Sequence, residues 1–271
     1  MAACVAPAAR AGGAAPALTA EEIVAKNAAA RGGVEAWRAV QTLVSIGHLE
    51  TAADHSTRPF LLEQKRPDKT RFEITVSGRK SVRAFDGARG WTERPGQSGD
   101  PDVRPFNPLE LTFAKQAPGI EGPLLDSAAR GTTVSLEGVE EINGQKAYRL
   151  NLRFASGEQH RLWVDTTTFL DVRYDRTSYT QAGKPTTLSV LYRDYHAVEG
   201  LEIPFMTVIG AGSGQATDRM IVDRVAVNAP LDDRVFSRPV ARRWRRAGGE
   251  GGAAEPPAAR LAAPAAVPAS Q

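Results

Sequence analysis

Residues 143–165 read NGQKAYRLNLRFASGEQHRLWVD, and two runs of alternating side chains fill this stretch. In the first run one set of alternate positions is apolar and consists of Tyr148, Leu150, Leu152 and Phe154. The positions between them hold Ala147, Arg149, Asn151 and Arg153. A period of two is typical of a β-strand with one buried face, and Ser-Gly between the runs is typical of a turn. The stretch therefore predicts an antiparallel hairpin with an apolar side and a charged side.

The same period of two recurs over most of the chain, divided by short turn signals such as Asp86-Gly87, which Trp91 follows on the return strand. In the first half we expect short strands at residues 44–48, 60–65, 72–76 and 82–85. In the second half we expect strands at residues 133–140, 145–155, 158–165, 170–180, 184–198, 203–210 and 219–227. Strands at this spacing indicate one large antiparallel sheet, a sandwich or a barrel.

Helical patterns are few. Thr19 with Glu22 is a capping-box pattern, and it opens a helix that should end at Gly32-Gly33 before a short helical piece carrying Trp37. Residues 94–123 are rich in proline and glycine and interrupt the strands, with a short helix expected at residues 108–115 and one more helical turn at 124–129. So little helix beside so many strands leaves two arrangements open. The sheet packs on itself, or it curls around the helices and leaves an apolar pocket.

Composition defines three segments. We expect residues 1–17 to be a disordered leader or signal remnant, residues 18–240 to be one domain, and residues 241–271 to be a disordered tail rich in Arg, Ala and Pro. Ala15-Pro16-Ala17 resembles a signal-peptidase site, and the residues ending at Cys4 resemble the end of a lipobox. Both features favour export, with lipidation of Cys4 as one route of attachment. The basic run at residues 242–246 is expected to be a solvated linker, with a membrane-surface contact as the alternative.

Several classes of function are disfavoured. The chain has 34 basic and 31 acidic residues, a balance that does not favour a nucleic-acid partner. Its single cysteine excludes an internal disulfide and a zinc site built from cysteines. The four histidines show no metal-ligand spacing, no nucleophile–base motif occurs, and Asp165, Asp171 and Asp175 are expected to be surface carboxylates. We therefore expect no catalytic residue, no cofactor and no metal.

A family resemblance rests on an ordered set of segments between about residues 20 and 210. They are EEIVAKNAAARGGVEAW, KRPDKTRFEITVSG, FDGARGW, IEGPLLD, VEEINGQKAYRLNLRFASGEQHRLWVD and DYHAVEGLEIPF. Together they resemble the LolA/LolB-like superfamily of the bacterial periplasm, in particular its outer-membrane lipoprotein-sorting or carrier-like proteins. The resemblance implies a half-open antiparallel β-barrel of roughly 9–11 strands wrapped around N-terminal and mid-chain lid helices. It also implies a protein that holds acyl chains by binding and release, without a cofactor.

On this basis we expect a monomeric, periplasmic, non-catalytic carrier whose apolar cavity holds lipid or lipoprotein acyl chains, with envelope transport proteins as further partners. The candidate cavity wall and lid residues are Trp37, Phe72, Ile74, Leu111, Phe113, Tyr148, Leu150, Leu152 and Phe154. For any single one of them, plain core packing is the favoured explanation. The alternative function is a ligand-free interaction or structural module of the cell envelope that uses the same fold, and an enzyme is the third hypothesis.

Overall fold

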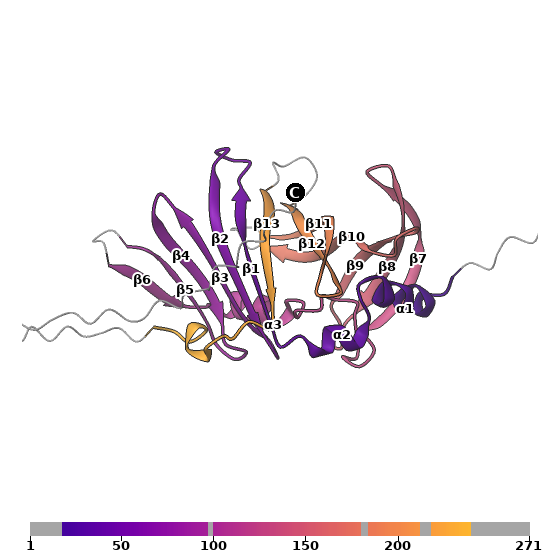
Figure 1. Ribbon diagram of the computed structural model, residues 1–271, viewed down its shortest axis with the longest axis horizontal. Helices are drawn as coiled ribbons and strands as arrows, with labels where there is room; N and C mark the ends of the chain where they lie inside the picture. The colour runs from indigo at the N-terminus through magenta and orange to yellow at the C-terminus, as the bar shows by residue number, and fades with distance from the viewer. Residues whose placement is uncertain (1–17, 97–99, 180–183, 212–217, 240–271) are drawn as a thin grey trace, which may run out of the picture. The chain divides into compact units, whose positions relative to one another are not determined.

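The computed structural model describes residues 18–96, 100–179, 184–211 and 218–239, and these belong to one compact unit that extends to Pro239. Within these ranges the chain is mostly β, with thirteen strands, three α-helices and one 3-10 turn (Figure 1). The helices are α1 (Ala20–Ala30), α2 (Val34–Ala39) and α3 (Pro108–Gln116), and the 3-10 turn is η1 (Asp233–Val235). The strands are β1 (Thr42–Glu50), β2 (Thr57–Lys65), β3 (Lys69–Val76), β4 (Arg79–Phe85), β5 (Gly90–Pro95), β6 (Pro101–Pro105), β7 (Thr133–Ile142), β8 (Gln145–Arg153), β9 (Gln159–Asp165), β10 (Asp171–Tyr179), β11 (Pro185–Val198), β12 (Leu201–Ala211) and β13 (Asp218–Val227).

All the described strands belong to a single antiparallel sheet with the order β6-β5-β4-β3-β2-β1-β13-β12-β11-β10-β9-β8-β7. Two meanders are joined where the first strand pairs with the last, for example Leu43 with Val227. The sheet does not close, because β6 and β7 are its two edges. Residues 106–132 connect these edges, so this long segment runs from one side of the open sheet to the other and carries α3 with it.

Local sequence explains how the helices begin and end. The Thr19 side chain accepts a hydrogen bond from the backbone N–H of Glu22, and the Glu22 carboxylate accepts one from the backbone N–H of Thr19, which confirms the predicted capping box. The turn after α1 brings Gly32 so close to Gly200 that a Cβ on it would lie 2.2 Å from the Gly200 carbonyl oxygen. A side chain is therefore excluded at Gly32, where φ is also +105°. None of the described helices is long and apolar enough to cross a membrane.

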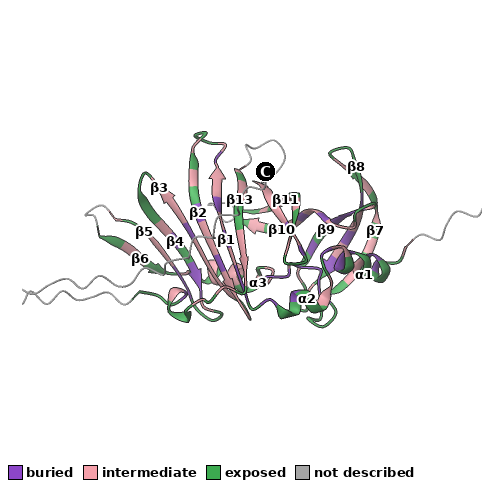
Figure 2. Ribbon diagram, in the orientation of Figure 1, coloured by how far each residue is buried: buried purple, intermediate pink, exposed green. Residues whose placement is uncertain are grey.

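The predicted half-open, mostly β fold is confirmed, with differences in detail. The described sheet has thirteen strands, more than the expected 9–11. One of the additional strands is β6, which lies within the stretch at 94–123 that was expected to lack strands. The short helix expected at residues 108–115 forms as α3, whereas residues 124–129 form hydrogen-bonded turns and not a helix. Figure 2 shows buried residues on β8 and β9 near α1 and half-buried residues along β1 and β13.

Candidate ligand-binding face

The two sides of the sheet can be distinguished by strand register and by the helices. Paired residues in an antiparallel sheet point to the same side, and successive residues alternate. We call the side on which α1 and α2 pack the inner face, and the opposite side the outer face. Leu150 and Leu152 lie on the inner face because they share a core cluster with Ile23 of α1. Leu43 does so as well, in a cluster with Trp37 of α2.

One part of the inner face is covered by α1 and by the turn at residues 124–130. Ile23 and Leu124 pack on β8, β9 and β10, and Leu150 and Leu152 beneath them have no solvent exposure. Tyr148 and Phe154 are half-buried at the margin of the same cluster. The hairpin therefore has an apolar side, as its sequence predicts. That apolar side forms part of the packed core under α1.

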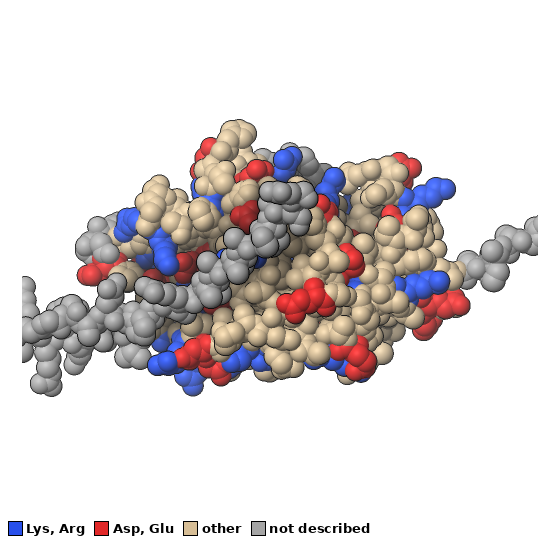
Figure 3. Space-filling model, in the orientation of Figure 1, with Lys and Arg blue, Asp and Glu red and all other residues tan. Residues whose placement is uncertain are grey.

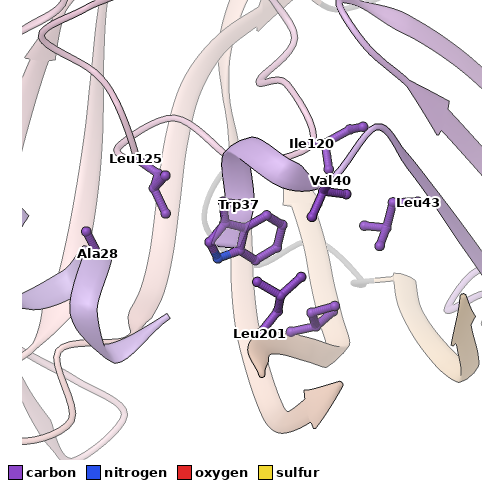
Figure 4. Packing of buried hydrophobic residues seen from close by; sticks show 8 residues of the cluster. Ala28, Trp37, Val40, Leu43, Ile120, Leu125 and Leu201 are labelled. Atoms are coloured by element: carbon purple, nitrogen blue, oxygen red, sulfur yellow. The ribbon is translucent and has the colours of Figure 1, made fainter. Parts of the chain in front are cut away.

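A second covered part lies beneath α2. Trp37 is 1% exposed and lies between Val40, Leu125 and Leu201 (Figure 4). Its indole Nε1–H donates to the carbonyl oxygen of Arg31 at 2.8 Å. Trp37 is separated from the cluster that holds Leu150, so the structure does not bring all the candidate residues into one site.

The rest of the inner face lies beyond α1 and α2. Register places Phe60 opposite Ile74 and Leu62 opposite Phe72. Both pairs share the face of Leu43, because Gln64 pairs with Leu43 and Leu62 with Ser45. The Phe60 and Phe72 rings are 5.8 Å apart. The same side of β1 and the later strands is also largely apolar and half-buried: Leu49, Leu188, Val190, Thr207, Ile209, Met220 and Val222. We call this set, with Leu62, Phe72 and Ile74, the open inner face.

α3 spans two strands that are not neighbours in the sheet. Arg83 of β4 donates to the Glu110 carboxylate at 3.0 Å, and the Phe113 ring lies 5.8 Å from the ring of Tyr179 at the end of β10. Leu111 and Phe113 are half-buried, whereas Leu109 is 44% exposed. Because β4 and β10 lie in different halves of the sheet, α3 bridges the opening between them.

Two cavities border the helices. One of about 440 Å³ lies between the segment after α3 and the ends of β8–β10, and its lining includes Pro118, Pro123, Arg130, Phe154 and Tyr174. The other, also about 440 Å³, is more apolar and lies against α1, α2 and β7, with Val24, Ala28, Val34 and Val134 in its lining. Each has the size of a small-molecule site. Phe154 is the one predicted wall residue that lines the first cavity.

A buried polar group ties α1 to the sheet. The Asn27 amide donates to the Asp171 carboxylate at 3.0 Å, and the Arg31 guanidinium lies 3.6 Å from the same carboxylate. Arg31 also donates to the carbonyl oxygen of Glu121 at 2.6 Å. Burial raises the pKa of the Asp171 carboxyl, against the opposing effects of Arg31 and Asn27. Asp165 and Asp171 were both expected at the surface, and the structure corrects this: they are 8% and 5% exposed, and Asp171 positions α1.

A second buried set resembles a catalytic relay in its connectivity only. His160 contacts the Tyr174 hydroxyl through Nδ1 at 2.5 Å and the Glu158 carboxylate through Nε2 at 2.8 Å. Both residues are only 2% exposed, although they also line the cavity beside Phe154. Burial raises the pKa of the Tyr174 hydroxyl, which disfavours the phenolate that nucleophilic attack requires. No cluster of metal-ligating side chains occurs among the described residues.

The outer face of β7, β8 and β10 carries charged side chains. Arg149 pairs with Glu137 and Glu140, and Arg173 pairs with Asp175 at 2.7 Å. In the view of Figure 3, basic and acidic side chains of the coloured residues are interspersed. Charge of both signs on this scale is typical of a solvated surface. Cys4, residues 15–17 and the basic run at 242–246 lie outside the described residues.

Comparison with known proteins gives the same architecture. No family model matches the chain, and no curated protein matches its sequence. A LolA superfamily protein from Nitrosomonas europaea superimposes with a TM-score of 0.54 and 16% identity, over 82% of this chain and 99% of that chain. A DUF1329 family protein from Desulfovibrio piger superimposes with a TM-score of 0.52 and 14% identity, over 80% of this chain and 97% of that chain. At these identities the likeness concerns the fold, and with its open antiparallel sheet and inner helices the chain has the LolA-like fold.

Proposed function

We propose that this protein is a non-catalytic carrier of the bacterial cell envelope that binds the acyl chain of a lipid or lipoprotein on its open inner face. The observation that carries the proposal is the half-buried apolar surface beyond α1 and α2, which includes Phe72 and Ile74. Covering an apolar sheet face of this kind removes it from water and lowers the free energy. The LolA-like fold supports the assignment, and so does the position of α3 across the opening.

The energetics suit reversible binding. Each methylene group of an acyl chain that leaves water contributes about 0.8 kcal/mol, and association and ordering costs offset part of the gross gain. A chain of ordinary length therefore binds without a covalent step or a cofactor. The open inner face and the cavity beside Phe154 lie on the same side of the sheet, so we propose that the chain extends from Phe72 and Ile74 toward α3 and Phe154. Leu111 and Phe113 would then contact it from above.

Titration of the full-length protein with a fluorescent long-chain fatty acid tests the proposal. We expect saturable binding of about one chain per protein, displaced by unlabelled fatty acid or phospholipid. A protein that takes up no acyl chain would overturn the carrier function. That result would favour the ligand-free envelope module, in which a partner protein covers the same apolar face.

A further inference from the structure

One arginine on the inner face, Arg176, has no charge partner among the residues that the structure describes. Arg176 of β10 lies on the inner face because it is two residues beyond Tyr174, which packs in the cluster under α1. It is half-buried, and it pairs in register with Leu188 of β11. Among the residues that the structure describes, no hydrogen-bond acceptor and no carboxylate pairs with its guanidinium group. A half-buried charge without a partner is costly, so such residues tend to mark binding sites.

Two other arginines on the inner face, by contrast, have charge partners. Arg58 and Arg83 lie on the same face and pair with Asp54 and Glu110. The inner-side carboxylates of this region are engaged elsewhere: Asp171 faces Asn27 and Arg31, and Glu158 is bonded to His160 at 2.8 Å. The guanidinium of Arg176 therefore keeps its donors for another group.

The surroundings of Arg176 combine polar donors with apolar surface. Ser178 pairs in register with Thr186. This pair lies two residues along the strands from the pair of Arg176 and Leu188, so it is also on the inner face. Both are half-buried, and their hydroxyl groups make no hydrogen bond within the described part of the chain. On the other side of Leu188, Val190 and Ile209 continue into the open inner face. A guanidinium and two hydroxyls thus stand at the border of an apolar surface.

We infer that Arg176, with Ser178 and Thr186, binds the anionic head of the acyl-chain ligand. The geometry selects a phosphate or a carboxylate, since a guanidinium donates paired hydrogen bonds to either group. This inference rests on the proposed function, because the chain of the same ligand would lie on Val190 and Ile209. It names the ligand class as an anionic amphiphile, in preference to a neutral lipid.

Affinities of the full-length protein for three probes of equal chain length test this assignment: hexadecanoate, hexadecyl phosphate and hexadecanol. We expect the two anions to bind roughly tenfold or more tightly than the alcohol, because only the anions accept charge-assisted hydrogen bonds from the guanidinium. Arg176→Gln should remove this preference while the alcohol binds as before, and Arg176→Lys should retain part of it. Arg193→Gln is the matched control, since Arg193 is exposed on the opposite face of the adjacent strand.

The outcomes separate the two claims. If all three probes bind but the anions hold no advantage, or hold the same advantage in Arg176→Gln, the inference is wrong and the carrier function stands. If no probe binds, both claims fail. Inorganic phosphate alone is the last probe. Weak competition of phosphate with hexadecyl phosphate would support a headgroup site. Tight binding of phosphate without uptake of any acyl chain would identify a site for free phosphate and overturn the inference.

Discussion

The division of the inner face into a covered core and an open binding surface predicts that stability and affinity respond to different residues. Leu150→Ala removes a side chain with no solvent exposure beneath α1. Such a change costs about 2–5 kcal/mol, because a cavity forms in addition to the lost transfer free energy. Leu150 does not reach the open inner face, so the affinity of the folded variant for an acyl chain should remain unchanged.

Ile74→Ala is the counterpart on the open inner face. Ile74 is half-buried in the free protein, so its truncation should lower the free energy of unfolding by only about 1 kcal/mol. In the complex the same side chain is covered, and the apolar area that the variant no longer buries should cost about 1–1.5 kcal/mol of binding, or roughly a tenfold loss of affinity. Urea unfolding and fatty-acid titration measure the two quantities. Equal losses of affinity in both variants, or a loss confined to Leu150→Ala, would refute the division.

Three further predictions concern the scaffold. Thr19→Ala should destabilise the protein by about 0.5–2 kcal/mol in urea unfolding, since it removes the side-chain cap of α1; an unchanged midpoint would contradict this. Gly47→Ala should prevent native folding or shift the circular-dichroism melting point down strongly, because its Cβ would lie 2.0 Å from the Ile221 carbonyl oxygen and 2.9 Å from the Phe60 ring. In alkaline titration, phenolate absorbance should appear late for three tyrosines, because burial of their hydroxyl groups raises the pKa above its ordinary value: Tyr174, Tyr192 and Tyr195. The folded state then holds protons that the unfolded state has lost, so stability should fall as the pH rises above about 10; ionisation of all the tyrosines near that pH without unfolding would contradict it.

The buried pair between Arg31 and Asp171 allows a separate test of how α1 is held. Arg31→Met leaves the Asp171 carboxylate buried without its cation and should cost about 3–5 kcal/mol. Adding Asp171→Leu should restore much of that stability, since both buried charges are then gone. Thermal or urea unfolding of the two variants measures the effect. A double variant less stable than Arg31→Met would contradict this expectation and would show that Asp171 stabilises the fold without Arg31, through its bond to Asn27.

The hairpin at residues 143–165 was predictable because two local signals agree there, a strict period of two and a Ser-Gly turn. β6 was not predictable, since its five residues begin and end with proline, and the pairing with β5 makes it a strand. In β12 the sequence LEIPFMTVIGA is almost continuously apolar, so its inner side follows from register and not from alternation.

The candidate site was predictable in its chemistry but not in its location. Alternation placed Leu150 and Phe72 on apolar sides of strands, but it does not show which part of a sheet the helices cover. Trp37 and Leu150 proved to lie in packed clusters, whereas Phe72 and Ile74 lie on the open inner face. Arg176 gave no signal in the sequence. Whether an arginine has a partner depends on strand register and on distant loops, and neither is visible in a local pattern.

Native mass spectrometry of the full-length protein purified from a bacterial host, with lipid analysis of its organic extract, tests the central claim most directly. We expect a near-stoichiometric bound lipid, fatty acid or acylated peptide, with an acidic head group. The same spectrum of Ile74→Ala should show lower occupancy, and that of Leu150→Ala should show occupancy like the parent protein in its folded fraction. A protein that is free of ligand as isolated and takes up no added fatty acid would contradict the account.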